Sequence, residues 1–136
     1  MLLNPYLLFN GQCEAAFKFY EKLLGGKIEA LLTHESAPPS SHIPPDWSKK
    51  IMHASLRING QSLMGSDAPP NYYEQPKGFS VSLHFKDAKE GERVFNSLAE
   101  NGQIKMPFQE TFWALRFGML VDRFGIPWMI NCEKPA

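Results

Sequence analysis

The chain has 136 residues, 43% of them hydrophobic and 12% aromatic, which is enough for one domain with a substantial core. Lysine plus arginine and aspartate plus glutamate both number 14, and this balance excludes strong electrostatic attraction to nucleic acid or to an anionic membrane. The sequence contains no apolar run of about 18 residues for a transmembrane helix, and its first residues lack the basic segment of a signal peptide.

The first predicted elements are a strand at 4–9 and a helix at 12–24, in which apolar residues recur at helical spacing until Gly25-Gly26 ends the helix. Three further strands are expected at 27–34, 50–58 and 61–66. The segment 35–48 contains four prolines and four serines, which predicts a surface flap.

The second half follows the same order. The pattern predicts a linker at 67–77, then a strand at 78–86, a helix at 88–100, and strands at 103–108, 113–121 and 126–132. Asp87 followed by Glu90 predicts a capping box at the start of this helix, and Asn101-Gly102 predicts its end.

The two halves align as a repeat. The helix ends match at an offset of 76 (95 − 19), and residues 59–64 match 124–129 at an offset of 65 (125 − 60). We assign the difference of about eleven residues to the flap. The sequence therefore predicts an α+β fold, a single domain over 1–136 made of two βαβββ modules at about 1–66 and 78–134.

Strand alternation then sorts side chains by face. In 51–58, Met52, Ala54, Leu56 and Ile58 are expected to face the helix and His53 to face away from it. By the offset of 65, Phe117 and Met119 are expected in the core, and Arg116 and Gly118 on the second face. The side chains expected to contact a ligand on that second face are Tyr6, Ser55, Arg57, Met64, Ser82, His84, Trp113 and Met129.

A face of mixed polarity on a curved sheet suits a small-molecule pocket, and the alternative is a solvated surface. We expect Glu110 and Trp113, from the run PFQETFWALRFG, to lie at the rim of this pocket. The two cysteines, Cys13 and Cys132, are too few for a disulfide framework, so we expect buried free thiols and a cytoplasmic protein.

Several segments resemble one family. Two βαβββ modules in about 130 residues resemble the vicinal oxygen chelate superfamily, which includes glyoxalase I and the bleomycin-resistance proteins. Within it, three stretches resemble the PhnB-like (YjdN-like) group: NPYLLFNGQCEAAFKFYEKLLGG, IMHASLRINGQSLMGSDAPP and QETFWALRFGMLVDRFGIPWMINC. The resemblance implies curved, cup-shaped mixed sheets with helices on the outer face, a small-molecule ligand, and a homodimer.

The resemblance also implies where a divalent metal would bind. The positions that correspond to the superfamily's ligands are Asn4, Met64, Ser80 and Met129. Hard divalent cations prefer carboxylate or carbonyl oxygens, and zinc prefers His, Cys or carboxylate, so two thioethers and a hydroxyl are poor ligands. We therefore expect no cofactor and no metal at the usual positions. A relocated metal site through His53, with Glu35, His84 or Glu110, is an alternative.

Three functions stay open. The first is a lyase or isomerase of glyoxalase-like type, with His53 as acid or base and with Glu110 or Arg116 orienting a polar substrate. The second is a non-catalytic protein that binds or sequesters a small molecule, as resistance proteins do, and the third is a structural dimer. Methyltransferase activity is not supported, because no Gly-rich turn follows the first strand and no parallel sheet is predicted.

Overall fold

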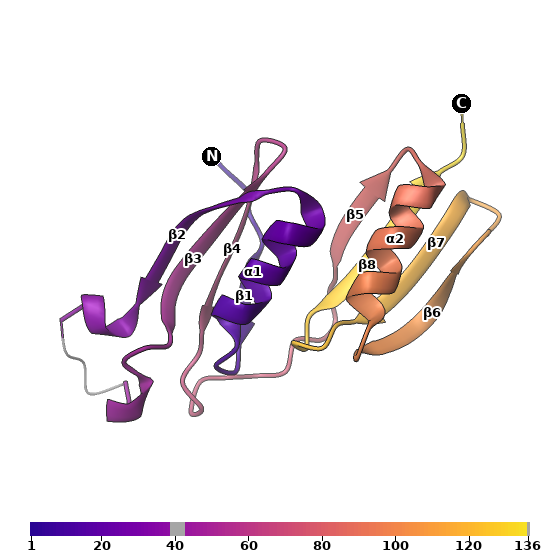
Figure 1. Ribbon diagram of the computed structural model, residues 1–136. Helices are drawn as coiled ribbons and strands as arrows, with labels where there is room; N and C mark the ends of the chain where they lie inside the picture. The colour runs from indigo at the N-terminus through magenta and orange to yellow at the C-terminus, as the bar shows by residue number, and fades with distance from the viewer. Residues whose placement is uncertain (39–42, 136) are drawn as a thin grey trace. The chain divides into compact units, whose positions relative to one another are not determined.

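The structure is a computed structural model that describes residues 1–38 and 43–135. The chain forms two compact units, Met1–Glu74 and Gln75–Ala136. Each unit contains one four-stranded sheet with one α-helix against one of its faces (Figure 1). The predicted α+β fold with two βαβββ modules is confirmed. Across the described residues, no helix is long and apolar enough to cross a membrane.

The first unit has the strand order β1-β4-β3-β2, in which β1 runs parallel to β4 and the other neighbours are antiparallel. Its elements in chain order are β1 (Tyr6–Phe9), α1 (Cys13–Leu24), β2 (Lys27–Thr33), the 3-10 turns η1 (His34–Ser36) and η2 (Pro45–Trp47), β3 (Ile51–Ile58) and β4 (Gln61–Asp67). The two 3-10 turns belong to the predicted flap, whose residues 39–42 lie outside the described part of the chain.

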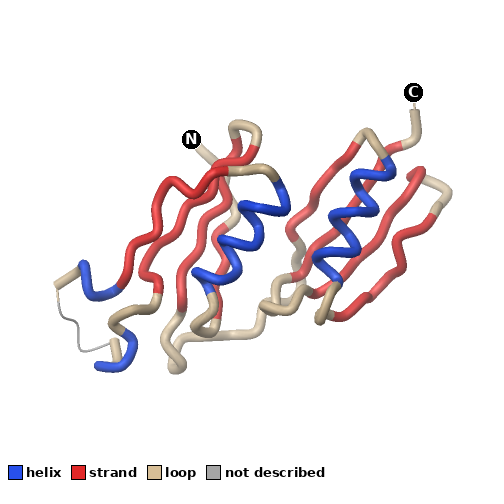
Figure 2. The backbone as a smooth tube through the Cα atoms, viewed as in Figure 1, coloured by secondary structure: helices blue, strands red, loops and turns tan. Residues whose placement is uncertain are grey.

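The second unit repeats this topology with the strand order β5-β8-β7-β6 (Figure 2). Its elements are β5 (Val81–Phe85), α2 (Ala88–Ala99), β6 (Gln103–Gln109), β7 (Ala114–Val121) and β8 (Pro127–Glu133). Here β5 is parallel to β8, and β7 is antiparallel to both β6 and β8. Most element ends fall within two residues of the prediction, and the largest difference is the later start of β5.

The helices pack closely on their sheets at a glycine in each unit. A Cβ added to Gly65 of β4 would lie 3.0 Å from Cε1 of Phe17, and one added to Gly118 of β7 would lie 2.6 Å from Cε2 of Phe95. Both distances are at or below the limit for a normal contact, so the absence of a side chain lets each aromatic ring reach the sheet. The core of each unit therefore lies between its helix and the adjacent face of its sheet.

The helix ends follow the sequence signals in most respects. Gly25 closes α1 in the left-handed conformation, with φ of 72°. Asp87 caps α2 by accepting a hydrogen bond from the backbone N–H of Lys89 at 3.0 Å. The second half of the predicted capping box differs, because the Glu90 carboxylate pairs with Arg93 at 3.0 Å. The Glu90 carboxylate therefore binds the Arg93 guanidinium, whereas in a capping box it would accept a hydrogen bond from the backbone N–H of Asp87.

Two carboxylates are almost fully buried, and each holds backbone segments together. Asp67, 3% exposed, accepts hydrogen bonds from the N–H groups of Cys13 and Ile51, both at 2.9 Å. Asp122, 4% exposed, lies in the β7–β8 connection and accepts three hydrogen bonds there. Both are structural groups, since their oxygens accept from backbone N–H groups at the starts of α1 and β3 or in the β7–β8 connection, and from the indole N–H of Trp128.

The two cysteines are free and buried, as predicted. Burial raises the pKa of the Cys13 thiol well above its usual value, and the nearby Asp67 carboxylate raises it further. Cys13 is therefore a protonated thiol packed at the start of α1, and such a thiol is a poor nucleophile.

Candidate functional site

Each sheet has a second face that its own helix does not cover, which we call the open face. In the first unit, cross-strand pairing joins Tyr6 of β1 to Met64 of β4, Met64 to Ser55 of β3, and Ser55 to Ala30 of β2. Paired residues point to the same side of a sheet, so these four form one row. Ala54, next to Ser55, is fully buried on the helix side, which fixes the row on the open face.

The main feature of this face is a contact between Tyr6 and His53. The Tyr6 hydroxyl lies 3.1 Å from Nδ1 of His53, and the two rings stack with centroids 5.8 Å apart and an angle of 28° between their planes. The side chains come from β1 and β3 and meet above β4, the strand between them. This contact fixes the orientation of the imidazole and leaves Nε2 as the nitrogen that the tyrosine does not engage.

The proton on the imidazole can occupy either nitrogen. If the Tyr6 hydroxyl donates to Nδ1, then Nε2 carries the proton and can act as a general acid; if Nδ1–H donates to the hydroxyl, Nε2 is a base. Tyr6 is 44% exposed and His53 is partly exposed, so a small molecule can reach the pair. The arrangement is chemically suited to moving a proton to or from a bound ligand.

The remaining predicted residues of the first unit surround this pair. Ser55 and Met64 lie in the same row as Tyr6, and both are partly exposed. Arg57, two residues after Ser55, is exposed and pairs with Ser62 and Lys27, near the end of β3. Its guanidinium therefore belongs to the edge of the face, where it can contact an anionic group.

In the second unit, the open face carries a small polar network. The Oγ atom of Ser82 lies 3.1 Å from Nε2 of His84, and Nδ2 of Asn131 lies 3.3 Å from Nδ1 of the same ring. Ser82 pairs with Met129, and His84 pairs with Asn131, so all four side chains share one face. Both nitrogens of His84 are engaged, in contrast to those of His53.

Arg116 lies on the opposite face from the one predicted. It pairs with Cys132, and Gly118 pairs with Ile130; both partners are fully buried, and Gly118 lies under Phe95 of α2. The paired positions Ser55 and Met64 are 9 residues apart, and the equivalent pair Met119 and Met129 is 10 residues apart (64 − 55 and 129 − 119), so the offset in β7 is 64 rather than 65. The prediction that Arg116 and Gly118 share the open face, with Phe117 and Met119 in the core, is wrong.

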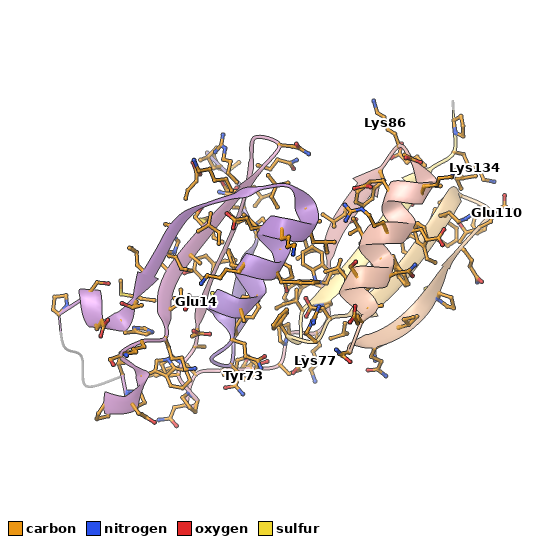
Figure 3. The ribbon with its side chains drawn as sticks, viewed as in Figure 1. Glu14, Tyr73, Lys77, Lys86, Glu110 and Lys134 are labelled. Atoms are coloured by element: carbon orange, nitrogen blue, oxygen red, sulfur yellow. The ribbon has the colours of Figure 1, made fainter. Side chains whose placement is uncertain are left out.

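Glu110 and Trp113 lie between β6 and β7. Figure 3 shows Glu110 at the end of this hairpin, and Nζ of Lys134 donates to the Phe112 carbonyl oxygen nearby, at 3.4 Å. Trp113, 51% exposed, packs edge-on against Phe117 with centroids 5.6 Å apart. Both residues belong to the second unit, so neither joins His53 within one unit.

The donor set at the superfamily's metal positions does not fit a hard cation. Asn4 and Ser80 precede their strands, and Met64 and Met129 offer thioethers. Over residues 1–38 and 43–135, no group of three His, Cys, Asp or Glu side chains is close enough to hold a metal ion. The relocated site through His53 stays a prediction.

Sequence reasoning missed several residues that the structure brings to these sites. The contact of Asn131 with His84 was not predicted. Asp67 and Asp122 were not identified as structural groups, although Asp67 is the last residue of β4 and Asp122 directly follows β7. Met106 and Met119 were also missed, the latter because of the one-residue error in β7.

Comparison with known proteins shows matches over nearly the whole chain. Residues 2–131 match the model of a family described as 3-demethylubiquinone-9 3-methyltransferase. The protein YjdN of Escherichia coli (strain K12) is 40% identical, over 98% of this chain and 97% of its own.

Two solved structures are also similar over nearly their whole length. Protein PA1353 from Pseudomonas aeruginosa has a TM-score of 0.90 and 48% identity, covering 99% of both chains. A putative 3-demethylubiquinone-9 3-methyltransferase, PhnB protein, from Bacillus cereus has a TM-score of 0.80 and 25% identity, covering 97% of this chain and 99% of its own.

Proposed function

Since this chain belongs to the family described as 3-demethylubiquinone-9 3-methyltransferase, the PhnB-like (YjdN-like) group of the vicinal oxygen chelate superfamily, we propose that it binds a small molecule of polar or mixed polarity on the open face of the first unit. The observation that carries the proposal is the contact between Tyr6 and His53. It combines an ordered imidazole, an accessible hydroxyl and apolar neighbours, which is the composition of a small-molecule site.

In this proposal His53 is the acid or base of a lyase or isomerase. Nε2 exchanges a proton with the ligand, while Tyr6 holds the ring and stabilises one tautomer through Nδ1. Arg57 at the edge of the face would orient a negatively charged substituent. Methyl transfer is not part of the proposal, because the two sheets of the described chain are mixed and each has only one parallel pair of strands.

The second candidate is binding without turnover. His53 is only partly exposed and Ser55, Met64 and Leu8 add a surface of mixed polarity, which suits retention of a ligand as well as its conversion. The two candidates differ in whether product forms, and they share the same site.

The experiment uses ligand-induced thermal stabilisation of the full chain with a panel of small carbonyl compounds, hydroxy acids and phosphonates. We expect His53→Ala to weaken binding of a stabilising compound at least about tenfold, equivalent to about 1.4 kcal/mol. Tyr6→Phe keeps the stacked ring and removes only the hydroxyl, so a smaller loss is expected. Lys18→Ala, on the exposed side of α1, is the control and should behave as the wild type.

Product analysis then separates the two candidates. If His53 is an acid or base, turnover should fall about 10² to 10⁴-fold in His53→Ala, with less change in KM. If wild-type protein binds the compound and forms no product, the protein sequesters its ligand. Unchanged affinity and unchanged turnover in His53→Ala would contradict the proposed site.

We further propose a homodimer in the cytoplasm. The family resemblance suggests the dimer, and the two unpaired buried thiols are consistent with a reducing compartment. Sedimentation or light scattering at micromolar concentration should give a mass near twice 15.4 kDa. A mass near 15.4 kDa under the same conditions would contradict the dimer.

A further inference from the structure

Three methionines lie side by side across the open face of the second unit. Cross-strand pairing joins Met106 of β6 to Met119 of β7, and Met119 to Met129 of β8. Met129 pairs in turn with Ser82 of β5, whose Oγ contacts His84. Half of the six methionines in the chain therefore belong to one row, which we call the methionine row.

The first unit contains the corresponding row with a different composition. Its members Ala30, Ser55, Met64 and Tyr6 occupy the same strand positions as Met106, Met119, Met129 and Ser82, in the same order. Only one of these four is a methionine. The two rows share the same backbone topology and differ in their side chains. The row of the first unit is therefore a control for ion binding by the methionine row.

The spacing of the methionine row allows its sulfur atoms to converge. Directly paired residues on neighbouring strands have Cβ atoms about 4.5–5.5 Å apart, and methionine has three flexible torsions beyond Cα. Met119 and Met129 are partly exposed and Met106 is 37% exposed, so the row is accessible to a small ion. Neighbouring thioethers that can turn toward one point are suited to one shared ligand.

Thioethers select soft monovalent cations. Cu(I) is bound by methionine sulfur, whereas Mg²⁺, Ca²⁺ and Mn²⁺ prefer oxygen and Zn²⁺ prefers thiolate, imidazole or carboxylate. Over residues 1–38 and 43–135, no cluster of three His, Cys, Asp or Glu groups competes for a harder ion. From this donor set we propose that the methionine row binds Cu(I) or the chemically similar Ag(I), through Sδ of Met106, Met119 and Met129.

The two thiols are also soft donors, and they must be distinguished from the methionine row. Cys13, the first residue of α1, and Cys132 of β8 are fully buried, and burial holds the pKa of Cys13 above its usual value. Binding to them requires opening of the core, whereas the methionine row is on the surface. Ion binding is also independent of the acid or base role proposed for His53, because the two involve different units.

The test is titration of the full chain, labelled with ¹³C at the methionine methyl groups, with Ag(I), a probe that needs no reductant. We expect the methyl signals of Met106, Met119 and Met129 to shift together and saturate at one ion per chain. Those of Met52 and Met64 should stay unchanged. Cu(I) under anaerobic conditions should move the same three signals, and Zn²⁺ should move none of them.

Affinity is then compared in three leucine variants, which keep side-chain volume nearly constant. Met119→Leu should weaken Ag(I) binding at least tenfold, and Met64→Leu, at the matching surface of the first unit, less than twofold. Met129→Leu is the second site variant, with the same expected loss of at least tenfold, and it keeps the test open if Met119→Leu is poorly folded. Equal shifts at Met64, no shift at the three methionines, or unchanged affinity in both site variants would overturn the proposal.

Discussion

Replacing Asp122 with alanine is expected to lower the free energy of unfolding by about 4 kcal/mol, one of the largest effects available to a single substitution in this chain. Its Oδ1 accepts from the N–H groups of Phe124 and Ile126 at 2.9 and 3.0 Å, and its Oδ2 accepts from Nε1 of Trp128 at 2.9 Å. Alanine would leave all three donors without this acceptor, at about 1–3 kcal/mol for each buried donor.

Asp122→Asn is the matched control, because it preserves shape and one oxygen. The amide oxygen can still accept from the two backbone N–H groups, while its NH₂ would face the Trp128 Nε1–H donor. We expect a loss of about 1–2 kcal/mol, from one unmet donor. Chemical denaturation monitored by circular dichroism measures both variants, and a loss below 1 kcal/mol in Asp122→Ala would contradict the structural role.

The fold could be predicted from the sequence because its signals are local and repeated. Apolar spacing defined both helices, and Gly25 ends α1 where expected. The repeat then supported the strand assignments, because a strand with a weak pattern in one half aligns with a predicted strand in the other half. The open face of the first unit followed from alternation along β3, where His53 lies opposite the buried Ala54.

The error in β7 shows the limit of the same reasoning. A shift of one residue reverses the face of every side chain in a strand, and that shift arises because paired positions of the β7–β8 hairpin are one residue further apart than their equivalents in the β3–β4 hairpin. Arg116 was therefore placed beside the site, and Met119 was placed in the core. One sequence feature favours the correct offset of 64. With that offset Gly118 aligns with the small Ala54, and a small residue at both positions fits the close approach of a helix.

Contacts between side chains on different strands could not be predicted. The pairing of Tyr6 with His53 depends on β4 lying between β1 and β3, and this order is a property of the whole sheet. The same applies to Asp67, which joins two segments that are 54 and 16 residues away. Such contacts depend on how several elements are placed relative to one another. The spacing of residues within one strand therefore does not predict them.

Replacing Asp67 with alanine is expected to cost about 3 kcal/mol of unfolding free energy. The carboxylate accepts from the N–H of Cys13, at the start of α1, and from the N–H of Ile51, at the start of β3, both at 2.9 Å. The side chain is 3% exposed, so water does not readily replace these bonds. Denaturant titration should show the loss, and Asp67→Asn, which retains one oxygen, should show about half of it.

The same variant has a second readout, the reactivity of Cys13, to which the loss of charge and the loss of packing contribute in the same direction. Burial raises the pKa of the Cys13 thiol most and the Asp67 carboxylate raises it further, so removing that negative charge lowers the pKa part of the way toward its usual value. Since the thiolate is the reactive form, modification of Cys13 by a thiol reagent in native conditions should be faster in Asp67→Ala than in wild-type protein. Asp67→Asn also removes the charge but opens the core less, so it separates the electrostatic effect from exposure. Equal Cys13 reactivity in wild type and both variants would show that burial alone protects the thiol.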